Sequence, residues 1–160
     1  MKKLLTFALT LVMVLFMSVT AFAAEINQGS EPKTADVTVT ISIDPTYTVT
    51  IPANTNVTFN TLSTTFGSVK LDAARIEPGH AVKVELNASG MLKNQADASK
   101  TIAYTINDAN GAFTSAQYTT AGEQTPLTID ITQAAWNAAF AGQYSDTVTF
   151  TVSYINTVTP

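Results

Sequence analysis

Two stretches of the chain alternate strictly between apolar and polar residues, which is the pattern of a β-strand with one buried face. Near the C-terminus, the apolar face carries Val148, Phe150, Val152 and Tyr154, and the polar face carries Thr149, Thr151 and Ser153. After the first 34 residues, a second apolar face carries Val37, Val39, Ile41 and Ile43. Both stretches are predicted to be strands that need a partner to cover their apolar side chains.

Shorter alternating segments, separated by turn residues, lie between these two stretches. Strands are expected at residues 46–51, 56–61, 66–76, 81–88, 101–106, 112–118 and 126–132, and a loop with one helical turn at 89–99. Strands do not alternate with long helices along the chain. The sequence therefore predicts an all-β fold, an Ig-like antiparallel β-sandwich of about seven to nine strands with one short helix.

The helical candidate spans residues 132–141. Thr132 is placed to cap its first turn, Trp136 and Phe140 share a face at positions i and i+4, and Gly142 follows its end. We expect this helix to dock as a plug over the open end of the sandwich. The alternative interpretation is that Trp136 belongs to a stacking platform for a sugar.

The first 23 residues are typical of a secretory signal peptide. Lys2 and Lys3 precede an uncharged apolar run, and the small residues Ala21 and Ala23 form an A-x-A cleavage signature. The expected mature chain then has a flexible polar leader at residues 24–34 and a single β-sandwich domain at residues 35–160. The protein is expected to be secreted, either extracellular or at the cell surface, with no membrane span after cleavage.

The charge balance and the absence of cysteine exclude several kinds of binding partner and binding site. The chain has 8 basic and 12 acidic residues, and two of the basic ones, Lys2 and Lys3, belong to the signal peptide. The expected mature chain is therefore clearly acidic, and nucleic acids and anionic membranes are poor partners for it. The chain has no cysteine, which excludes disulfides and thiolate metal sites. A secreted domain without disulfides fits a bacterial exported protein.

The sequence shows no constellation of residues typical of an enzyme. His80 is the only histidine and follows a Pro-Gly turn. No His, Asp or Glu cluster has the spacing of metal ligands, and no nucleophile motif occurs. Residues 107–111 (NDANG) lack the first carboxylate of a calcium loop and predict an Asn-Gly hairpin turn instead. We therefore expect a non-enzymatic protein that uses no cofactor and no metal.

Residues 35–51 (ADVTVTISIDPTYTVTI) and 141–154 (AGQYSDTVTFTVSY) resemble the first and last strands of bacterial fimbrial-subunit-like domains. The nearest likenesses are the spore coat protein U group and the alternate-chaperone (class 5) fimbrial subunits. The resemblance implies an Ig-like fold that lacks its final strand, which a neighbouring subunit supplies by β-strand addition. The matching donor residues would be Val37, Val39, Ile41 and Ile43. The matching acceptor edge would be residues 146–155, with Val148, Phe150, Val152 and Tyr154 on its apolar face.

Two functions of different classes follow from these features. The first is a structural or adhesive protein, a pilus- or coat-like subunit that forms a homo-oligomer or binds a cell-surface partner. The second is a monomeric extracellular carbohydrate-binding module in which Trp136 contacts the glycan. The sequence leaves open whether residues 35–43 pair within their own chain, as first strands of secreted sandwiches commonly do, or within a neighbour.

Overall fold

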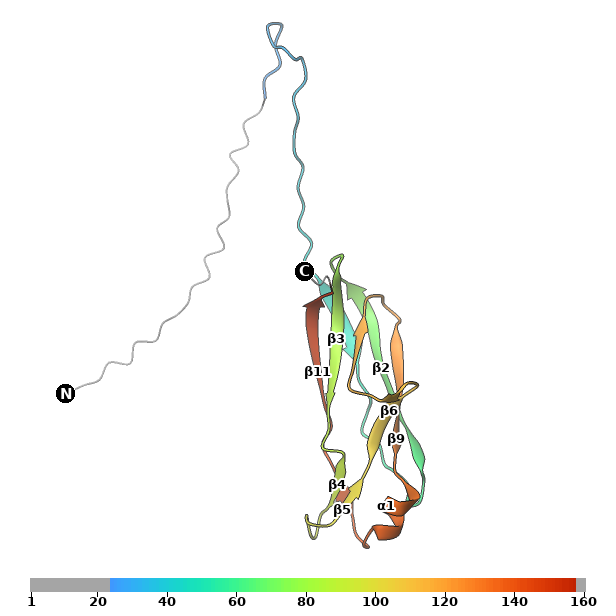
Figure 1. The fold of residues 1–160 in the computed structure, drawn as a ribbon. Coiled ribbons are helices and arrows are strands. Elements are labelled where there is room, and N and C mark those ends of the chain that lie inside the picture. Colours follow the sequence, from blue (N-terminus) through green and yellow to red (C-terminus); the bar gives the residue numbers. More distant parts are fainter. Residues whose placement is uncertain (1–23, 158–160) are drawn as a thin grey trace, which may run out of the picture. The chain divides into compact units, whose positions relative to one another are not determined.

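The computed structural model describes residues 24–157, and the chain divides into two units, residues 1–42 and 43–160 (Figure 1). The predicted signal peptide, with Ala21 and Ala23, lies outside the described residues. Residues 24–42 contain no helix and no strand, and form turns near Gly29. All the regular structure in the described part of the chain belongs to the second unit.

The second unit is an all-β sandwich with one short helix. Its described residues form eleven strands in three antiparallel sheets. The first sheet has the order β1 (Thr46–Thr50), β2 (Ser63–Arg75), β9 (Gln124–Asp130), β6 (Thr105–Asp108) and β7 (Gly111–Ala112). The second has the order β11 (Thr149–Asn156), β3 (His80–Asn87) and β8 (Ser115–Tyr118). The third has the order β10 (Tyr144–Ser145), β4 (Met91–Asn94) and β5 (Thr101–Ala103).

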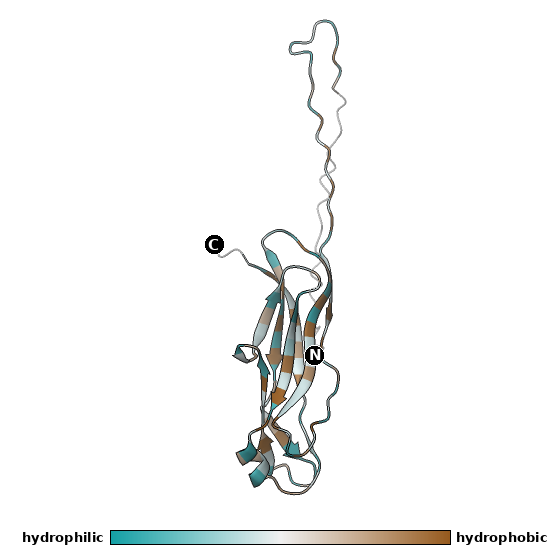
Figure 2. Ribbon diagram, turned by 90° about the vertical axis from the view of Figure 1, so that its right-hand side faces the viewer, coloured by the Kyte–Doolittle hydropathy of each residue, from teal (hydrophilic) through white to brown (hydrophobic). Residues whose placement is uncertain are grey.

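The apolar core lies between the sheets and is built from alternate residues of the strands (Figure 2). Val69 and Leu71 of β2 and Val82 and Val84 of β3 are fully buried. Burial of a side chain of this size contributes about 1.5–3 kcal/mol. The other members of the buried cluster are Ile102, Tyr104, Ile106, Phe113, Tyr118, Leu127, Ile131 and Trp136. The predicted all-β sandwich is thus confirmed, and its buried core draws on residues 69–136.

Two of the predicted strands are coil in the structure. Residues 36–43 have the alternation of a strand, but they have no ladder partner and therefore remain coil. Residues 56–61 also form no strand. The ladder of β1 with β2 stops at Thr50, and Pro52 has no N–H with which to continue it.

One predicted loop contains a strand, and one predicted strand is divided. Residues 91–94 form β4 within the region expected to be a loop, and they pair with both β5 and β10. Residues 101–106 divide at Tyr104 because Thr101–Ala103 pairs with β4, whereas Thr105–Asp108 pairs with β9 in the first sheet. The chain thus crosses from one sheet to another at Tyr104.

The helix α1 (Gln133–Ala138) lies within the predicted range but ends three residues earlier. The Thr132 hydroxyl accepts a hydrogen bond from the Ala135 N–H at 3.2 Å, as expected of an N-cap. In the described part of the chain, no helix has the length and apolar character needed to cross a membrane.

Candidate strand-binding groove

A pair of adjoining cavities forms a groove in the second unit, beside the edge strands of two sheets. Their volumes are about 440 and 710 Å³. Thr55, Val57, Leu92 and Asp146 line both cavities and join them. The first cavity is also lined by Ile51, Pro52, Ala53, Asn54, Phe66, Tyr104, Ile129, Thr147, Val148 and Phe150, and the second by Asn56, Phe59, Ile102, Trp136, Ala139, Phe140, Ala141, Gly142, Tyr144 and Ser145.

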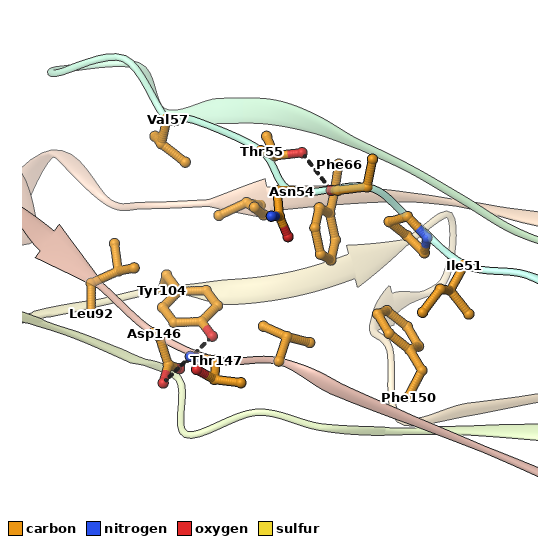
Figure 3. Close-up of a pocket in the computed structure, with 14 residues that line it drawn as sticks. Ile51, Asn54, Thr55, Val57, Phe66, Leu92, Tyr104, Asp146, Thr147 and Phe150 are labelled. Atoms are coloured by element: carbon orange, nitrogen blue, oxygen red, sulfur yellow. Dashed lines mark hydrogen bonds between the residues drawn. The ribbon is translucent and has the colours of Figure 1, made fainter.

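The two walls of the groove come from segments far apart in the sequence. One wall is the coil at residues 51–59, which continues from β1, and the other is residues 144–150, which lead into β11. Figure 3 shows the rings of Phe66 and Tyr104 between these walls and the ring of Phe150 projecting from the second wall. Among the described strands, β1 pairs only with β2 and β11 only with β3, so both are edge strands. The groove therefore lies next to the end of one edge strand, β1, and the beginning of another, β11.

One carboxylate lies where the two cavities meet. Asp146 Oδ2 accepts a hydrogen bond from the Tyr104 hydroxyl at 2.7 Å, and Oδ1 accepts one from the Thr147 N–H at 2.8 Å (Figure 3). Oδ2 also accepts a hydrogen bond from the Ser89 hydroxyl at 2.7 Å. Burial opposes ionisation of Asp146, but these donors outweigh it and lower the pKa of the carboxyl. Burial and the adjacent carboxylate raise the pKa of Tyr104. The cluster ties the chain before β11 to the crossing point between β5 and β6.

The predicted acceptor residues divide between two environments. All four, Val148, Phe150, Val152 and Tyr154, are half-buried and pack against the core, on the face that their alternation indicated. Val148 and Phe150 line the groove, whereas Val152 and Tyr154 do not. Tyr154 instead stacks between two rings, with its centroid 6.2 Å from that of Tyr47 and 5.0 Å from that of His80.

The predicted donor residues are largely exposed. The exposed fractions are 82% for Val37, 91% for Val39, 86% for Ile41 and 58% for Ile43. Exposure of four large apolar side chains in succession is unfavourable in water, and such a segment is typically an interaction site.

Trp136 and Phe140 lie in different environments. Trp136 is 8% exposed, its Nε1–H donates to the Thr61 carbonyl at 3.0 Å, and its ring contacts that of Phe59 edge-on. Little of its face is open for stacking on a sugar. Phe140 is exposed, with the Lys100 ammonium 4.8 Å from its ring centroid.

Three features of the groove and of the edge strands beside it were missed by sequence reasoning. The wall at residues 51–59 was expected to include a strand, and Asp146 was not singled out from the other carboxylates. The contact of Tyr47 with Tyr154 joins residues more than 100 positions apart, and no local pattern marks it. Within residues 24–157, no three His, Asp or Glu side chains are grouped so that they could hold a metal ion.

Comparisons with known proteins found little similarity. No protein-family model matches the chain, and no curated protein matches it significantly. Among solved structures, the chain is similar to one described as "Chaperone-tip adhesin complex is vital for synergistic activation of CFA/I fimbriae biogenesis". The TM-score is 0.46 and the sequence identity 14%, over 67% of this chain and 42% of that chain. The chain thus spans less than half the length of the matched structure.

Proposed function

We propose that the protein is a non-enzymatic, secreted or cell-surface structural subunit that assembles by β-strand addition. Residues 35–43 of one copy bind as an extra strand in the groove of a second copy. The observation that carries this proposal is the groove itself, which lies between residues 51–59, just after the edge strand β1, and residues 144–150, which lead into the edge strand β11. A strand added there would complete the sandwich and cover both edges.

The chain itself contains a segment whose chemistry fits the groove. Val37, Val39, Ile41 and Ile43 fall on one face of an extended segment and are exposed. That face is complementary to a groove lined by Val57, Phe66, Ile129, Val148 and Phe150, among others. The opposite face carries Thr38, Thr40 and Ser42, which are uncharged and suited to water. One segment therefore supplies an apolar face for the groove and a polar face for solvent.

Main-chain pairing adds to the apolar contacts. The outer edge of β11 has N–H and C=O groups that no described strand pairs with, and an added strand satisfies such groups by a new ladder. The donor segment contains no proline between residues 35 and 43, so each of its residues has an N–H to donate. Strand addition thus combines main-chain affinity with side-chain specificity.

The test compares the mass of the chain from Ala24 to Pro160 with that of a chain beginning at Asp44, by light scattering. The shorter chain retains every buried residue of the core, since these lie at residues 69–136. We expect a ladder of oligomers from the longer chain and a single monomer from the shorter one. In the longer chain, the pair Val39→Asp and Ile41→Asp should abolish the ladder, because both charges would enter the apolar groove.

The matched control places the same charges on the opposite face. The pair Thr38→Asp and Thr40→Asp leaves the apolar face intact and should preserve the ladder. If the longer chain is a monomer, or if both pairs have the same effect on the oligomers, strand addition by this segment is wrong.

A further inference from the structure

An exposed apolar surface adjoins the second cavity at one end of the sandwich. Building on the strand addition proposed above, we infer that this surface binds the opposite end of a second copy's sandwich, so that copies joined by an added strand also stack end to end. The surface consists of Phe59, Leu62 and Phe140, and we call it the end surface. The partner is a second copy of this chain, but the contact lies outside the added strand.

The two ends of the sandwich carry different segments. At one end, β1 and β3 begin and β2 and β11 end, because Thr46 pairs with Arg75 and His80 with Asn156. At the other end lie α1 and the hairpin of β4 with β5 (Figure 1). We call these the β1 end and the α1 end. The second cavity belongs to the α1 end, since Trp136 of α1 lines it.

Three large apolar side chains are exposed at the α1 end. The exposed fractions are 74% for Phe59, 51% for Leu62 and 61% for Phe140. Phe59 and Phe140 line the second cavity, and Leu62 follows Thr61, whose carbonyl accepts the hydrogen bond from Trp136. A group of exposed apolar side chains of this kind is typical of an interaction site.

A short connector keeps the donating sandwich close to the groove that its donor segment enters. Only Asp44 and Pro45 separate the last donor residue, Ile43, from Thr46, the first residue of β1. Three residues of extended chain span about 10 Å. The sandwich of the donating copy therefore begins within that distance of the place where its donor segment ends, and must lie against one end of the accepting sandwich.

The direction of the added strand decides which end that is. Since β11 runs from the groove toward the β1 end, an added strand antiparallel to β11 ends at the α1 end, and a parallel one ends at the β1 end. Every ladder between the described strands is antiparallel, and antiparallel pairing is slightly more stable per residue. The added strand is therefore antiparallel to β11, and the donating copy lies against the end surface.

The same direction also gives each neighbour an end of its own. The donor segment of every copy joins its sandwich at the β1 end, through Asp44 and Pro45. Parallel addition would bring the second neighbour to this end as well, so that two sandwiches compete for one place. Antiparallel addition places one neighbour at the β1 end and the other at the α1 end.

The β1 end of the donating copy offers an apolar partner for the end surface. Tyr47 follows the first residue of β1 and is 39% exposed. Its ring is held in place by stacking on Tyr154, with the centroids 6.2 Å apart. A fixed aromatic side chain of the donating copy thus lies next to the connector, where it can cover exposed apolar groups of the end surface.

The first test cross-links the two ends of neighbouring copies, which is clean because the natural chain has no cysteine. The chain from Ala24 to Pro160 carries Thr46→Cys at the β1 end and Ala138→Cys on α1, both at exposed positions. A flexible bis-maleimide is added to the assembled protein, and the products are separated on a denaturing gel. We expect a ladder of cross-linked chains from the double variant and only single chains from each variant with one cysteine.

The other results of this test separate the inference from the proposed function. Cross-linked dimers from Thr46→Cys alone would show that two β1 ends meet, and would overturn the inference. A double variant that assembles but yields no cross-link would overturn it as well. If the unaltered chain forms no oligomers in light scattering, the strand addition on which the inference rests is itself refuted.

The second test uses Leu62→Ser, because Leu62 lines neither cavity. In the chain from Ala24 to Pro160, the variant should raise the protein concentration at which half of the oligomers dissociate by about tenfold, since burial of a leucine side chain is worth about that factor. In the chain beginning at Asp44, it should leave the affinity for a peptide of residues 35–43 unchanged. Equal dissociation concentrations for the variant and the unaltered chain would overturn the inference.

The matched control is Met91→Ser. Met91 is 42% exposed, lines neither cavity, and pairs with Ala103 at the end of the β4–β5 hairpin that is farther from its turn. This variant should change neither the dissociation concentration nor the affinity for the peptide. A loss of peptide affinity in Leu62→Ser as large as its loss of assembly would place Leu62 in the strand-binding groove, and would also overturn the inference.

Discussion

At the residue scale, the segment before β10 depends on a glycine packed against a buried asparagine. Gly142 has φ +144°, and a Cβ added there would lie 2.4 Å from Asn94 Nδ2. Asn94 is 5% exposed, and its Oδ1 accepts hydrogen bonds from the N–H groups of Ala96 and Asp97. Gly142→Ala would displace this amide, and we expect a loss of about 2–3 kcal/mol in the free energy of unfolding, measured in urea.

The control for this substitution is Gly111→Ala. Gly111 has a similar φ of +120°, but an added Cβ would meet nothing within 4 Å. Its cost should be the backbone strain alone, about 1 kcal/mol. Equal losses in the two variants would show that the contact with Asn94 does not matter.

Asp146 makes the stability of the sandwich depend on acid pH. Its folded pKa is lowered, so the stabilisation is present above the unfolded value of about 4 and is lost as pH falls through the folded value. Asp146→Asn replaces the charged carboxylate with a neutral amide, which is a weaker acceptor for the two hydroxyl hydrogen bonds. The substitution should lower the free energy of unfolding by about 1–3 kcal/mol at pH 7. The cost should begin to shrink below about pH 4, where the unfolded carboxyl binds a proton, and should be smallest once the pH is below the lowered folded pKa.

The measurement is the free energy of unfolding of both proteins from pH 7 to pH 2. Asp130 provides an internal reference, since a hydrogen bond from the Ser63 hydroxyl, at 2.5 Å, also lowers the pKa of its carboxyl and is present in both proteins. The free energies of unfolding of the two proteins should therefore approach each other as the pH falls. Both should still decrease with pH, because Asp130 titrates in both proteins. A constant difference across the range would contradict the linkage to Asp146.

At the scale of elements, period-two alternation predicted most of the sandwich. Residues 81–88 and 126–132 were expected to be strands and became β3 and β9, because each alternation supplied a face that a core could bury. Residues 36–43 have an equally regular alternation but are not a strand. Alternation shows that a segment can form a strand. Whether it does so depends on a ladder partner, which the local sequence does not specify.

For the candidate site as well, alternation identified single strand residues but not the segments that lie beside them in space. Val148 and Phe150 were singled out from their alternation, and both line the groove. The opposite wall, residues 51–59, is coil because β1 stops before Pro52, and its position beside β11 follows from the packing of two sheets. Contacts such as Tyr47 with Tyr154 join distant strands, so they depend on topology that periodicity does not encode.

At the scale of the whole molecule, the described fold is a sandwich with an open seam and a separate segment of matching chemistry. Strand addition predicts that the segment acts wherever it is attached, provided that it can reach the groove. This is tested by a chain that begins at Asp44 and ends with residues 35–43. Those residues are attached after Pro160 through a linker of about twelve Gly and Ser residues. Such a linker has an average span of about 20 Å, comparable with the groove.

We expect this fused chain to be a monomer that melts at least about 5 °C above the chain beginning at Asp44, which corresponds to roughly 1 kcal/mol in a domain of this size. The gain should vanish when the appended copy carries Val39→Asp and Ile41→Asp, and should persist with Thr38→Asp and Thr40→Asp, since only the first pair alters the apolar face. If neither pair of Asp substitutions changes the melting temperature of the fused chain, the groove does not bind the segment. A fused chain that still forms a ladder of oligomers would mean that the contacts between subunits lie elsewhere on the sandwich.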